Sequence, residues 1–331
     1  MTPPAGRAHG RTPVFLRTAR LRKMAVKGGR LAALSLRNLG RTEDGAHIRA
    51  EVAAGLIGAP AIVARHCEVR AGADNIGITV YRCTPASGAE GPAYFLQKQT
   101  RSTREYRTAR ALADAGIATV LPRIYGTAVG RLRFSLMMEW WDNAETLDET
   151  WRCSPEALAR SVHRLGLDLA PLAKAGVIAE SERYFAALTG RFEAHLRDVC
   201  GIRPPALAQA RLALADLPRV VSHDDLNPLN AVTLEGDPRG VGFIDLGGLR
   251  VNAAGSAFQR LAIDAVAGGE TRLLLDAAEA YERLTGLARN RVLFAAHFYA
   301  ASRQLNRAIN KSFAAPFDQP ARHIAEALRY L

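Results

Sequence analysis

The sequence predicts an α+β protein in which a small β-rich segment precedes a larger, mainly helical one. Short runs rich in β-branched residues, separated by turn-forming stretches, lie between Ile62 and Trp140. Beyond residue 150, alanine- and leucine-rich stretches with helix-capping signals dominate instead. The chain has 331 residues, of which 48% are hydrophobic, so it can bury a sizeable core and is neither disordered nor fibrous.

No β-strand is predicted in the first sixty residues. Residues 1–30 mix proline, glycine and arginine without periodicity, which is typical of a basic arm. Apolar residues recur at near-helical intervals over residues 31–60 and are interrupted near Gly40–Gly45, so two short helices are expected there.

Strands and one helix follow. The helix is expected from Ser102 to Ala115, because Ser102 can cap its first turn, Glu105 occupies the third position of a capping box and Gly116 can end it. The turn-prone segment AGADNIG and a loop rich in proline and glycine separate the first three strands. The strands are predicted at Ile62–Val69, Ile76–Tyr81, Ala93–Gln99, Arg123–Tyr125 and Arg133–Trp140.

The rest of the chain predicts helices around one hairpin. Ser154 followed by Pro155 opens a helix, and Ser181 opens another. Two further helices are expected at residues 206–216 and 271–284. The hairpin is predicted from the β-rich segments Ala231–Leu234 and Val241–Asp245, which flank a turn.

The positive charge is concentrated at the start of the chain. The formal net charge is +12, and residues 1–50 contain eleven Arg or Lys but only two acids, so they carry +9 and the remaining 281 residues carry +3. A basic arm can contact an anionic membrane surface. Nucleic-acid binding is not expected, because Phe15 is the only aromatic residue within the arm.

Cysteine usage and hydropathy indicate a cytoplasmic setting. The four cysteines lie far apart without a CxxC pair, which argues against a zinc site and a disulfide-built fold. Apolar stretches are interrupted before they reach bilayer length, and the arm lacks the pattern of a secretory signal.

The strongest chemical signal is the segment HDDLNPLN, His223–Asn230, followed after the hairpin by Asp245-Leu246-Gly247. Phosphoryl transfer needs a carboxylate near the attacking hydroxyl and separate oxygen ligands for Mg²⁺. Asp225 and Asn230 have the spacing of a kinase catalytic loop, and Asp245 begins a sequence close to the kinase metal-binding Asp-Phe-Gly.

These motifs resemble the HGDLxxxN loop of the aminoglycoside phosphotransferase and choline kinase superfamily. The resemblance implies a two-lobed protein-kinase-like fold and a phosphotransferase that uses ATP and Mg²⁺. It assigns Asp225 as the catalytic base or hydroxyl-orienting residue and Asn230 and Asp245 as metal ligands. His223 would hold the backbone of the loop in place.

The resemblance continues upstream in the correct order. YFLQKQT resembles the family's third strand and makes Lys98 the phosphate-binding lysine, with Glu105 of the following helix as its partner. MMEWW resembles the linker between lobes, which implies that backbone groups of Glu139 and Trp140 bond the adenine ring. Asn75 lies in a segment that resembles the family's loose phosphate-binding loop.

Local alternatives exist for each residue. Asp225, Asn230 and Asp245 also suit a surface hairpin, Lys98 an exposed strand, Glu105 a capping box alone and Asn75 a plain turn. Trp140 and Trp141 also suit interlobe packing. Two positions depart from the family: Asp224 replaces a glycine of the loop, and Gly248 stands where many members have a second aspartate.

The implied organisation has three parts: a basic arm and helix at residues 1–46, a nucleotide-binding lobe at 47–141 and a catalytic lobe at 142–331. The acceptor is expected to be a hydroxyl of a small molecule or glycan, bound by residues after Leu249. Arg260, Asp264, Tyr299 and Arg303 are available there. Two alternatives stay open: a kinase of a lipid-linked or lipopolysaccharide-core sugar acting at the inner membrane face, and a nucleotide-binding pseudokinase.

Overall fold

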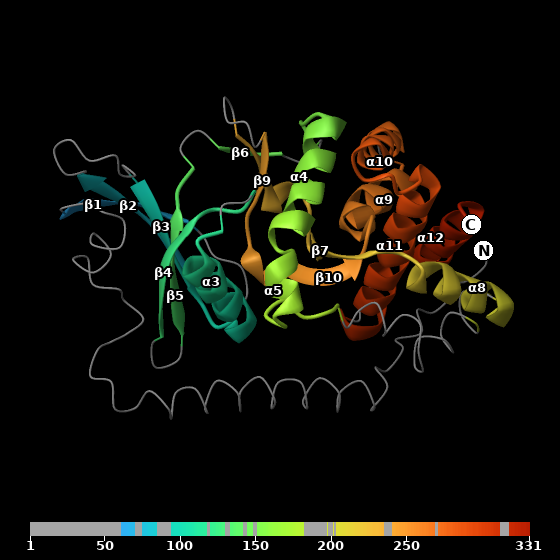
Figure 1. Ribbon diagram of the computed structural model, residues 1–331, viewed down its shortest axis with the longest axis horizontal. Coiled ribbons are helices and arrows are strands. Elements are labelled where there is room, and N and C mark those ends of the chain that lie inside the picture. The colour runs from blue at the N-terminus through green and yellow to red at the C-terminus, as the bar shows by residue number, and fades with distance from the viewer. Residues whose placement is uncertain are drawn as a thin grey trace, which may run out of the picture.

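The computed structural model has the expected two-lobed α+β, protein-kinase-like architecture (Figure 1). The basic arm, the expected helices at residues 31–60, the helix opening at Ser181 and the hairpin tip at 235–239 lie outside the described residues. The structure describes residues 61–69, 75–84, 94–117, 120–129, 133–141, 144–147, 151–181, 197, 201, 203–234, 240–268, 271–311 and 318–331.

The N-lobe is built on a five-stranded antiparallel sheet in the order β1-β2-β3-β5-β4. β3 is central, so Lys98 on this strand lies between Ile78 of β2 and Leu136 of β5. The strand expected to end at Tyr125 continues to Val129 because it pairs with β5 along this length. The strands are β1 Ala61–Val69, β2 Asn75–Thr84, β3 Tyr94–Thr100, β4 Ile124–Val129 and β5 Phe134–Glu139.

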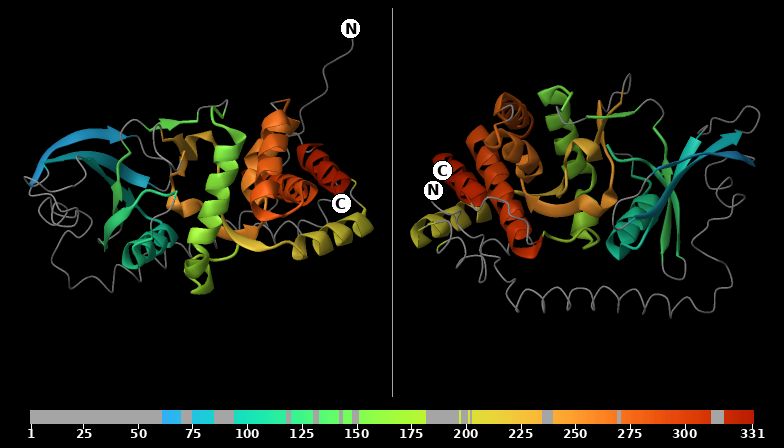
Figure 2. Two further views of the ribbon diagram at one scale, coloured as in Figure 1. Left: turned by 45° about the horizontal axis from the view of Figure 1, so that its top comes forward. Right: turned by 180° about the vertical axis from the view of Figure 1, so that it is seen from behind.

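Helix α3, Thr103–Ala115, connects β3 to β4 and lies beside the sheet (Figures 1 and 2). The hydroxyl of Ser102 accepts a hydrogen bond from the Glu105 amide at 3.2 Å, and Gly116 ends the helix at φ 60°. Both termini confirm the sequence prediction. The Tyr106 ring stacks on Phe134 of β5 at 4.5 Å and fixes the helix against the sheet.

The C-lobe contains two small sheets among its helices. β6 (Glu145–Thr146), β8 (Ala231–Thr233) and β9 (Val241–Phe243) form one antiparallel sheet, and the β8–β9 pair confirms the predicted hairpin. β7 (Arg219–His223) pairs with β10 (Leu249–Ala253), so the two ends of the segment between these strands, residues 223–249, lie side by side.

Helices surround these sheets, as Figure 2 shows. The Ser154 hydroxyl caps the first of them by accepting from the Ala157 amide at 3.0 Å, as expected. A proline begins α8 two residues before the predicted start, in the position that proline favours. The helices are α4 Pro155–Asp168, α5 Ala170–Lys174, α8 Pro204–Ala215, α9 Gln259–Val266, α10 Thr271–Thr285, α11 Arg289–Lys311 and α12 Asp318–Arg329.

The described residues share one large apolar cluster that crosses the lobe boundary. It joins Leu136 of the N-lobe sheet to Phe243 of β9 and to Phe258 beneath the catalytic segment. A second cluster packs α8, α11 and α12 together. In the part of the chain that the structure describes, no helix combines the length and hydropathy needed to cross a bilayer.

Candidate active site

The segment His223–Asn230, predicted from its sequence to be the catalytic loop, leaves β7 at His223 and enters a short 3₁₀ turn, Pro228–Asn230. The side-chain amides of Asn227 and Asn230 both donate to the Asp225 carbonyl oxygen at 2.9 Å. Asn227 also accepts from the Leu229 amide at 2.9 Å. These bonds close the loop on itself and leave the Asp225 side chain 41% exposed at its rim.

His223 lies at the base of the loop with no exposed surface. Its Nε2 is 2.9 Å from the Ile244 carbonyl oxygen and 3.0 Å from that of Asp245, so the protonated Nε2 donates to this turn. His223 thereby ties the loop that contains Asp225 to the segment that contains Asp245. This contact agrees with the expected scaffold role of His223.

The departure at Gly248 has a steric cause. A Cβ atom at this position would lie 2.4 Å from Cε1 of His223. Real Cβ atoms essentially never come this close to another atom. The Gly248 carbonyl also accepts from the Asp224 amide at 2.7 Å. An aspartate at Gly248 is therefore incompatible with this arrangement of His223.

Asp224, the second departure, does not share the position of Asp225. Asp224 is 4% exposed, whereas the Asp225 side chain reaches the surface of the loop, so the two neighbouring carboxylates lie in different surroundings. The Asp224 carbonyl oxygen accepts from Gln259 at 2.9 Å and from Arg303 at 3.2 Å. Asp224 thus contributes its backbone to the support of the loop.

Lys98, Glu105 and Asp245 meet between the lobes. The Lys98 ammonium lies 2.5 Å from Glu105 Oε1 and 3.1 Å from Asp245 Oδ1. The Ser102 amide bonds Thr100 Oγ1 at 3.0 Å, which shows that Glu105 does not complete a capping box but faces Lys98 instead. The alternative of an exposed strand lysine is wrong, since Lys98 is 6% exposed.

The charges of these three groups are coupled. Burial alone would lower the pKa of Lys98, but the carboxylates of Glu105 and Asp245 outweigh it and raise this pKa above its ordinary value. Burial also opposes ionisation of Asp245, yet the nearby Lys98 ammonium lowers its pKa. At Glu105 burial dominates and raises the pKa. Lys98 therefore stays protonated at neutral pH.

Asn230 and Asp245 each carry a side-chain oxygen of the kind that could hold Mg²⁺, which proteins bind through one or two carboxylates together with substrate phosphates. The Ile244 amide donates to the Asn230 carbonyl oxygen at 2.9 Å, which brings Asn230 beside the residue that precedes Asp245. Asp245 has φ 69°, a left-handed conformation that is uncommon outside glycine. Among the described residues, no three acidic, histidine or cysteine side chains form a metal cluster.

Of the predicted linker residues, Glu139 is hydrogen-bonded to the residue that precedes β4. The Glu139 amide donates to the Arg123 carbonyl at 2.8 Å, and Glu139 Oε2 accepts from the Arg123 amide at 3.0 Å. Trp140 follows directly after β5 and is partly buried. A Cβ at Gly242 would lie 2.6 Å from the Trp141 ring, so Trp141 packs tightly on β9 of the C-lobe, in agreement with interlobe packing. Asn75 begins β2 opposite Thr100.

Two contacts at the site have no counterpart in the sequence motifs. Arg303 of α11 forms an ion pair with Asp225, and Arg104 of α3 donates to the Gly247 carbonyl at 2.7 Å. Arg303 and Asp225 are 78 residues apart, and no spacing rule connects them. The only sequence signal for Arg303 was its place among the polar residues after Leu249.

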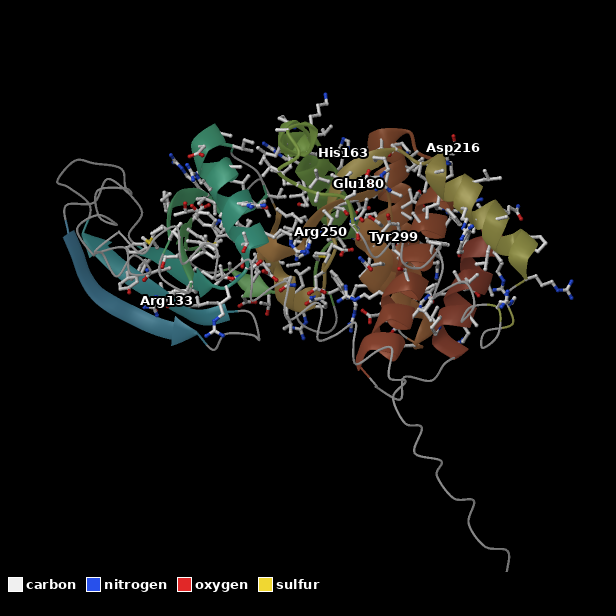
Figure 3. The ribbon with its side chains drawn as sticks, turned by 90° about the horizontal axis from the view of Figure 1, so that it is seen from below. Arg133, His163, Glu180, Asp216, Arg250 and Tyr299 are labelled. Atoms are coloured by element: carbon white, nitrogen blue, oxygen red, sulfur yellow. The ribbon has the colours of Figure 1, made fainter. Side chains whose placement is uncertain are left out.

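The other residues suggested for acceptor binding have structural partners. The Tyr299 hydroxyl accepts from the Ala253 amide at 3.1 Å within the core of the C-lobe (Figure 3). Arg260 pairs with Asp264 at 2.9 Å, and Asp264 also accepts from the Trp151 indole at 3.2 Å. Tyr299 is thereby explained as a core residue.

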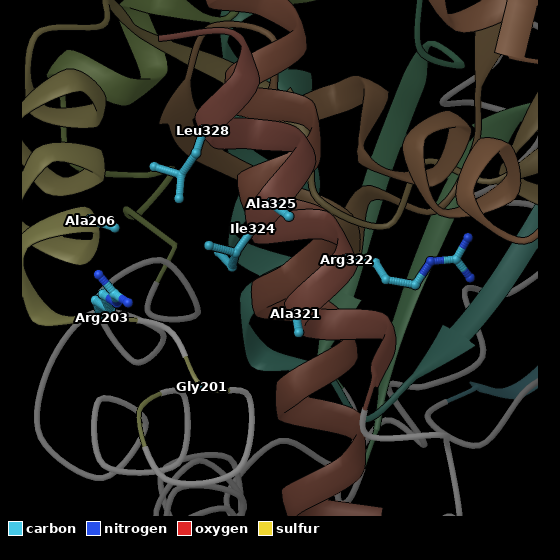
Figure 4. Close-up of a pocket in the computed structure, with 8 residues that line it drawn as sticks. All are labelled: Gly201, Arg203, Ala206, Ala321, Arg322, Ile324, Ala325 and Leu328. Carbon is cyan, nitrogen blue, oxygen red and sulfur yellow. The ribbon is translucent and has the colours of Figure 1, made fainter.

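A groove of about 490 Å³ lies between the start of α8 and one face of α12 (Figure 4). α8 and α12 are at the opposite end of the molecule from the N-lobe sheet (Figure 1). None of the residues described above around Asp225 lines the groove. Its lining residues are Gly201, Arg203, Ala206, Ala321, Arg322, Ile324, Ala325 and Leu328.

Residues 71–293 match the model of the phosphotransferase enzyme family, and the chain belongs to this family. It is a phosphotransferase, as the sequence motifs predicted. No curated protein matches the chain.

Solved structures share the fold at low identity. The chain is similar to wild-type aminoglycoside 2'-phosphotransferase-IIIa in its GDP complex, with a TM-score of 0.53, 11% identity and coverage of 81% of this chain and 93% of that one. A point mutant of that enzyme, also as its GDP complex, gives a TM-score of 0.52 and 12% identity over 82% and 92% of the two chains. Choline kinase from Cryptosporidium parvum Iowa II has 11% identity and a TM-score of 0.49 over 80% of this chain and 88% of its own.

Proposed function

We propose that this phosphotransferase moves the γ-phosphate of ATP to a hydroxyl group of a small molecule or glycan. The observation that carries the proposal is the contact of Lys98 with Glu105 and Asp245, which come from three separate segments. His223, at the start of the loop that contains Asp225, bonds the Asp245 carbonyl oxygen. A cytoplasmic setting, where ATP is present, is part of the proposal.

Each residue has a role that follows from its chemistry. Lys98, oriented by Glu105, would neutralise the α- and β-phosphates, and the backbone at Glu139 and Trp140 would face the adenine. Asn75 would approach the phosphates from β2. Asn230 and Asp245 would hold Mg²⁺, which offsets phosphate charge when bound. Asp225 would accept or orient the proton of the acceptor hydroxyl.

Nucleotide binding tests the first half of the proposal. Isothermal calorimetry with Mg²⁺ and ATP should give a saturable signal with the full chain, and Asp245→Ala should weaken it strongly. The same titration with GTP identifies the donor, since two similar solved structures are GDP complexes. The proposal would be overturned if neither nucleotide bound and if the substitution Asp245→Ala had no effect on the titration.

The acceptor requires a screen coupled to ADP release, run beside Asp225→Ala to remove background hydrolysis. Polycationic aminoglycosides are expected to be poor acceptors, because the Asp225 carboxylate is already paired with Arg303 and the chain carries a positive net charge. Phosphorylated sugars, lipid-linked glycans and neutral hydroxyl compounds should be included. Nucleotide binding without transfer to any acceptor would favour a pseudokinase.

A membrane-surface kinase is the second candidate, and the +9 charge of residues 1–50 favours it. Sedimentation with vesicles of phosphatidylcholine and phosphatidylserine should pull down the full chain at low salt. A chain that begins at Ala46 should stay in the supernatant. Equal binding by both chains would remove the membrane role of the arm.

A further inference from the structure

We infer that Arg303 is a positioning residue that holds the Asp225 carboxylate in its working orientation; this inference rests on the proposed function. Arg303 comes from α11 and is 6% exposed. A buried guanidinium needs a partner to offset its desolvation. Its partner is the half-exposed carboxylate of Asp225.

The guanidinium fork bonds two consecutive residues of the catalytic loop. Nη1 donates to the Asp224 carbonyl at 3.2 Å, and Nη2 donates to Asp225 Oδ1. A planar fork with fixed donor directions can fix a backbone and a side chain at once, which the single ammonium of lysine cannot do. Arg303 therefore sets the orientation of the Asp225 side chain relative to the carbonyl of the preceding residue, Asp224.

The remaining loop contacts do not duplicate this role. Asn227 and Asn230 bond the Asp225 carbonyl, and Gln259 bonds the Asp224 carbonyl. Within the described part of the chain, Arg303 is the one side chain that bonds the Asp225 carboxylate. Loss of Arg303 should thus free the carboxylate while the loop backbone keeps its amide contacts.

The consequence concerns turnover rather than nucleotide affinity. One oxygen of Asp225 is held by Arg303, so the other is available to the acceptor hydroxyl in a defined direction. A carboxylate that rotates spends less time in that direction. The nucleotide contacts Lys98, Glu105 and Asp245 lie in a separate cluster and do not involve Arg303.

The test measures the rate of ADP release from Mg–ATP by the full chain, with water as the acceptor. The rate of the Asp225→Asn variant is subtracted, which leaves the part of the rate that depends on Asp225. Arg303→Met should lower kcat for this part by about 10- to 100-fold, the range expected when a general base is misplaced. KM for ATP and the calorimetric affinity for Mg–ADP should change less than about twofold. Arg303→Lys should recover part of the loss, because it restores the charge but not the fork.

Arg291 supplies the matched control. It lies on the same helix and also bonds one aspartate twice, at the carbonyl (2.7 Å) and the carboxylate (2.6 Å) of Asp216, which is outside the loop His223–Asn230. Arg291→Met should leave kcat unchanged. Guanidinium chloride at millimolar concentration should raise the rate of Arg303→Ala several-fold and leave Arg291→Ala unaffected.

The outcomes separate this inference from the proposed function. If Asp225→Asn is inactive but Arg303→Met keeps the wild-type kcat, the role of Arg303 is overturned and the proposed function stands. If Arg303→Met and Arg303→Lys both lose nucleotide affinity and melting temperature together, without guanidinium rescue, Arg303 is merely structural. If no part of the rate depends on Asp225, the catalytic assignment itself fails.

Discussion

Gly248 shows how tightly the residues of the site constrain one another. Its missing side chain leaves room for the His223 ring, whose Nε2 bonds two carbonyl oxygens of the neighbouring turn. A single methyl group at Gly248 must displace either the ring or the turn. The absence of a second aspartate at this position therefore follows from the close approach of the His223 ring.

Gly248→Ala should destabilise the protein by about 1–3 kcal/mol, the usual cost of overpacking a rigid site. It should also weaken Mg–ADP binding, because His223 holds the Asp245 carbonyl. Urea unfolding and calorimetry measure the two effects. The control for the unfolding measurement is Gly77→Ala, since a Cβ at Gly77 meets no atom within 4 Å. Equal unfolding free energies for the two variants would contradict the steric argument.

Contacts between residues of the same short sequence motif could be predicted, whereas contacts between residues that only the fold brings together could not. Lys98 and Glu105 are seven positions apart on a strand and the next helix, so the motif order indicated their pairing. Arg303 reaches Asp225 from a helix 78 residues later. The sequence allowed two roles for the side chain of Glu105, and the structure decides between them through its ion pair with Lys98 and the contact of the Ser102 amide with Thr100.

At the scale of elements, α11 and α12 hold an unusual buried pair. The rings of His297 and His323 approach within 3.3 Å at their Nδ1 atoms, and His297 also stacks on Tyr330. A hydrogen bond between two Nδ1 atoms requires one free nitrogen as acceptor, so at least one ring is neutral. Burial lowers the pKa of His297 to about 4 and that of His323 to about 3, the latter also through His297 and Arg322.

This pair should make the packing of α11 on α12 sensitive to acid. Both pKa values lie below the unfolded value of 6.5, so the unfolded chain binds more protons than the folded one below pH 6.5. The contribution to stability is complete above pH 6.5 and falls as the pH decreases toward 4. Each histidine should account for about 2 kcal/mol lost at pH 5.

Urea unfolding between pH 7.5 and pH 5 checks this expectation. His323→Leu should reduce the dependence on pH by roughly half, because one buried titrating ring is removed. His163→Gln serves as the control, since His163 lies on α4 with its ring edge against Tyr281 and away from the pair. The same steep acid dependence in His323→Leu as in the wild type would refute the assignment.

Local elements were easier to predict than the pairing between them. Ser102, Gly116 and Ser154 indicated helix termini that the structure confirms, because capping depends on neighbours in the sequence. The pairing of β7 with β10 joins two five-residue strands across the catalytic loop and hairpin. Such short strands carry little periodicity, and their partnership depends on the contacts of the whole lobe.

At the scale of the molecule, the lobes meet through polar contacts as well as through the shared apolar cluster. The Phe243 amide of β9 donates to the Val120 carbonyl at 2.8 Å, and Arg104 of α3 bonds the Gly247 carbonyl. Lys98 bonds Asp245 across 147 residues of sequence. A nucleotide bound at Lys98 and Asp245 would therefore contact both lobes.

Mg–ADP should raise the melting temperature of the full chain through these contacts. A ligand at one hundred times its Kd stabilises the folded state by about 2.7 kcal/mol, which corresponds to about 4 °C for a chain of this size. Differential scanning calorimetry measures the shift over a series of nucleotide concentrations. In Lys98→Met the shift should be lost, because the phosphates lose their cation and Glu105 keeps a buried carboxyl without its ammonium partner.

Lys174→Met is the matched control. Lys174 is an exposed lysine in the last turn of α5 and makes none of the interlobe contacts above. Its variant should show the full nucleotide-dependent shift, and its melting temperature without nucleotide should stay near that of the wild type. Lys98→Met should melt lower than the wild type even without nucleotide, since its loss affects the contact between β3, α3 and Asp245. A nucleotide-dependent shift of equal size in Lys98→Met and Lys174→Met would show that the nucleotide does not bind between the lobes at Lys98.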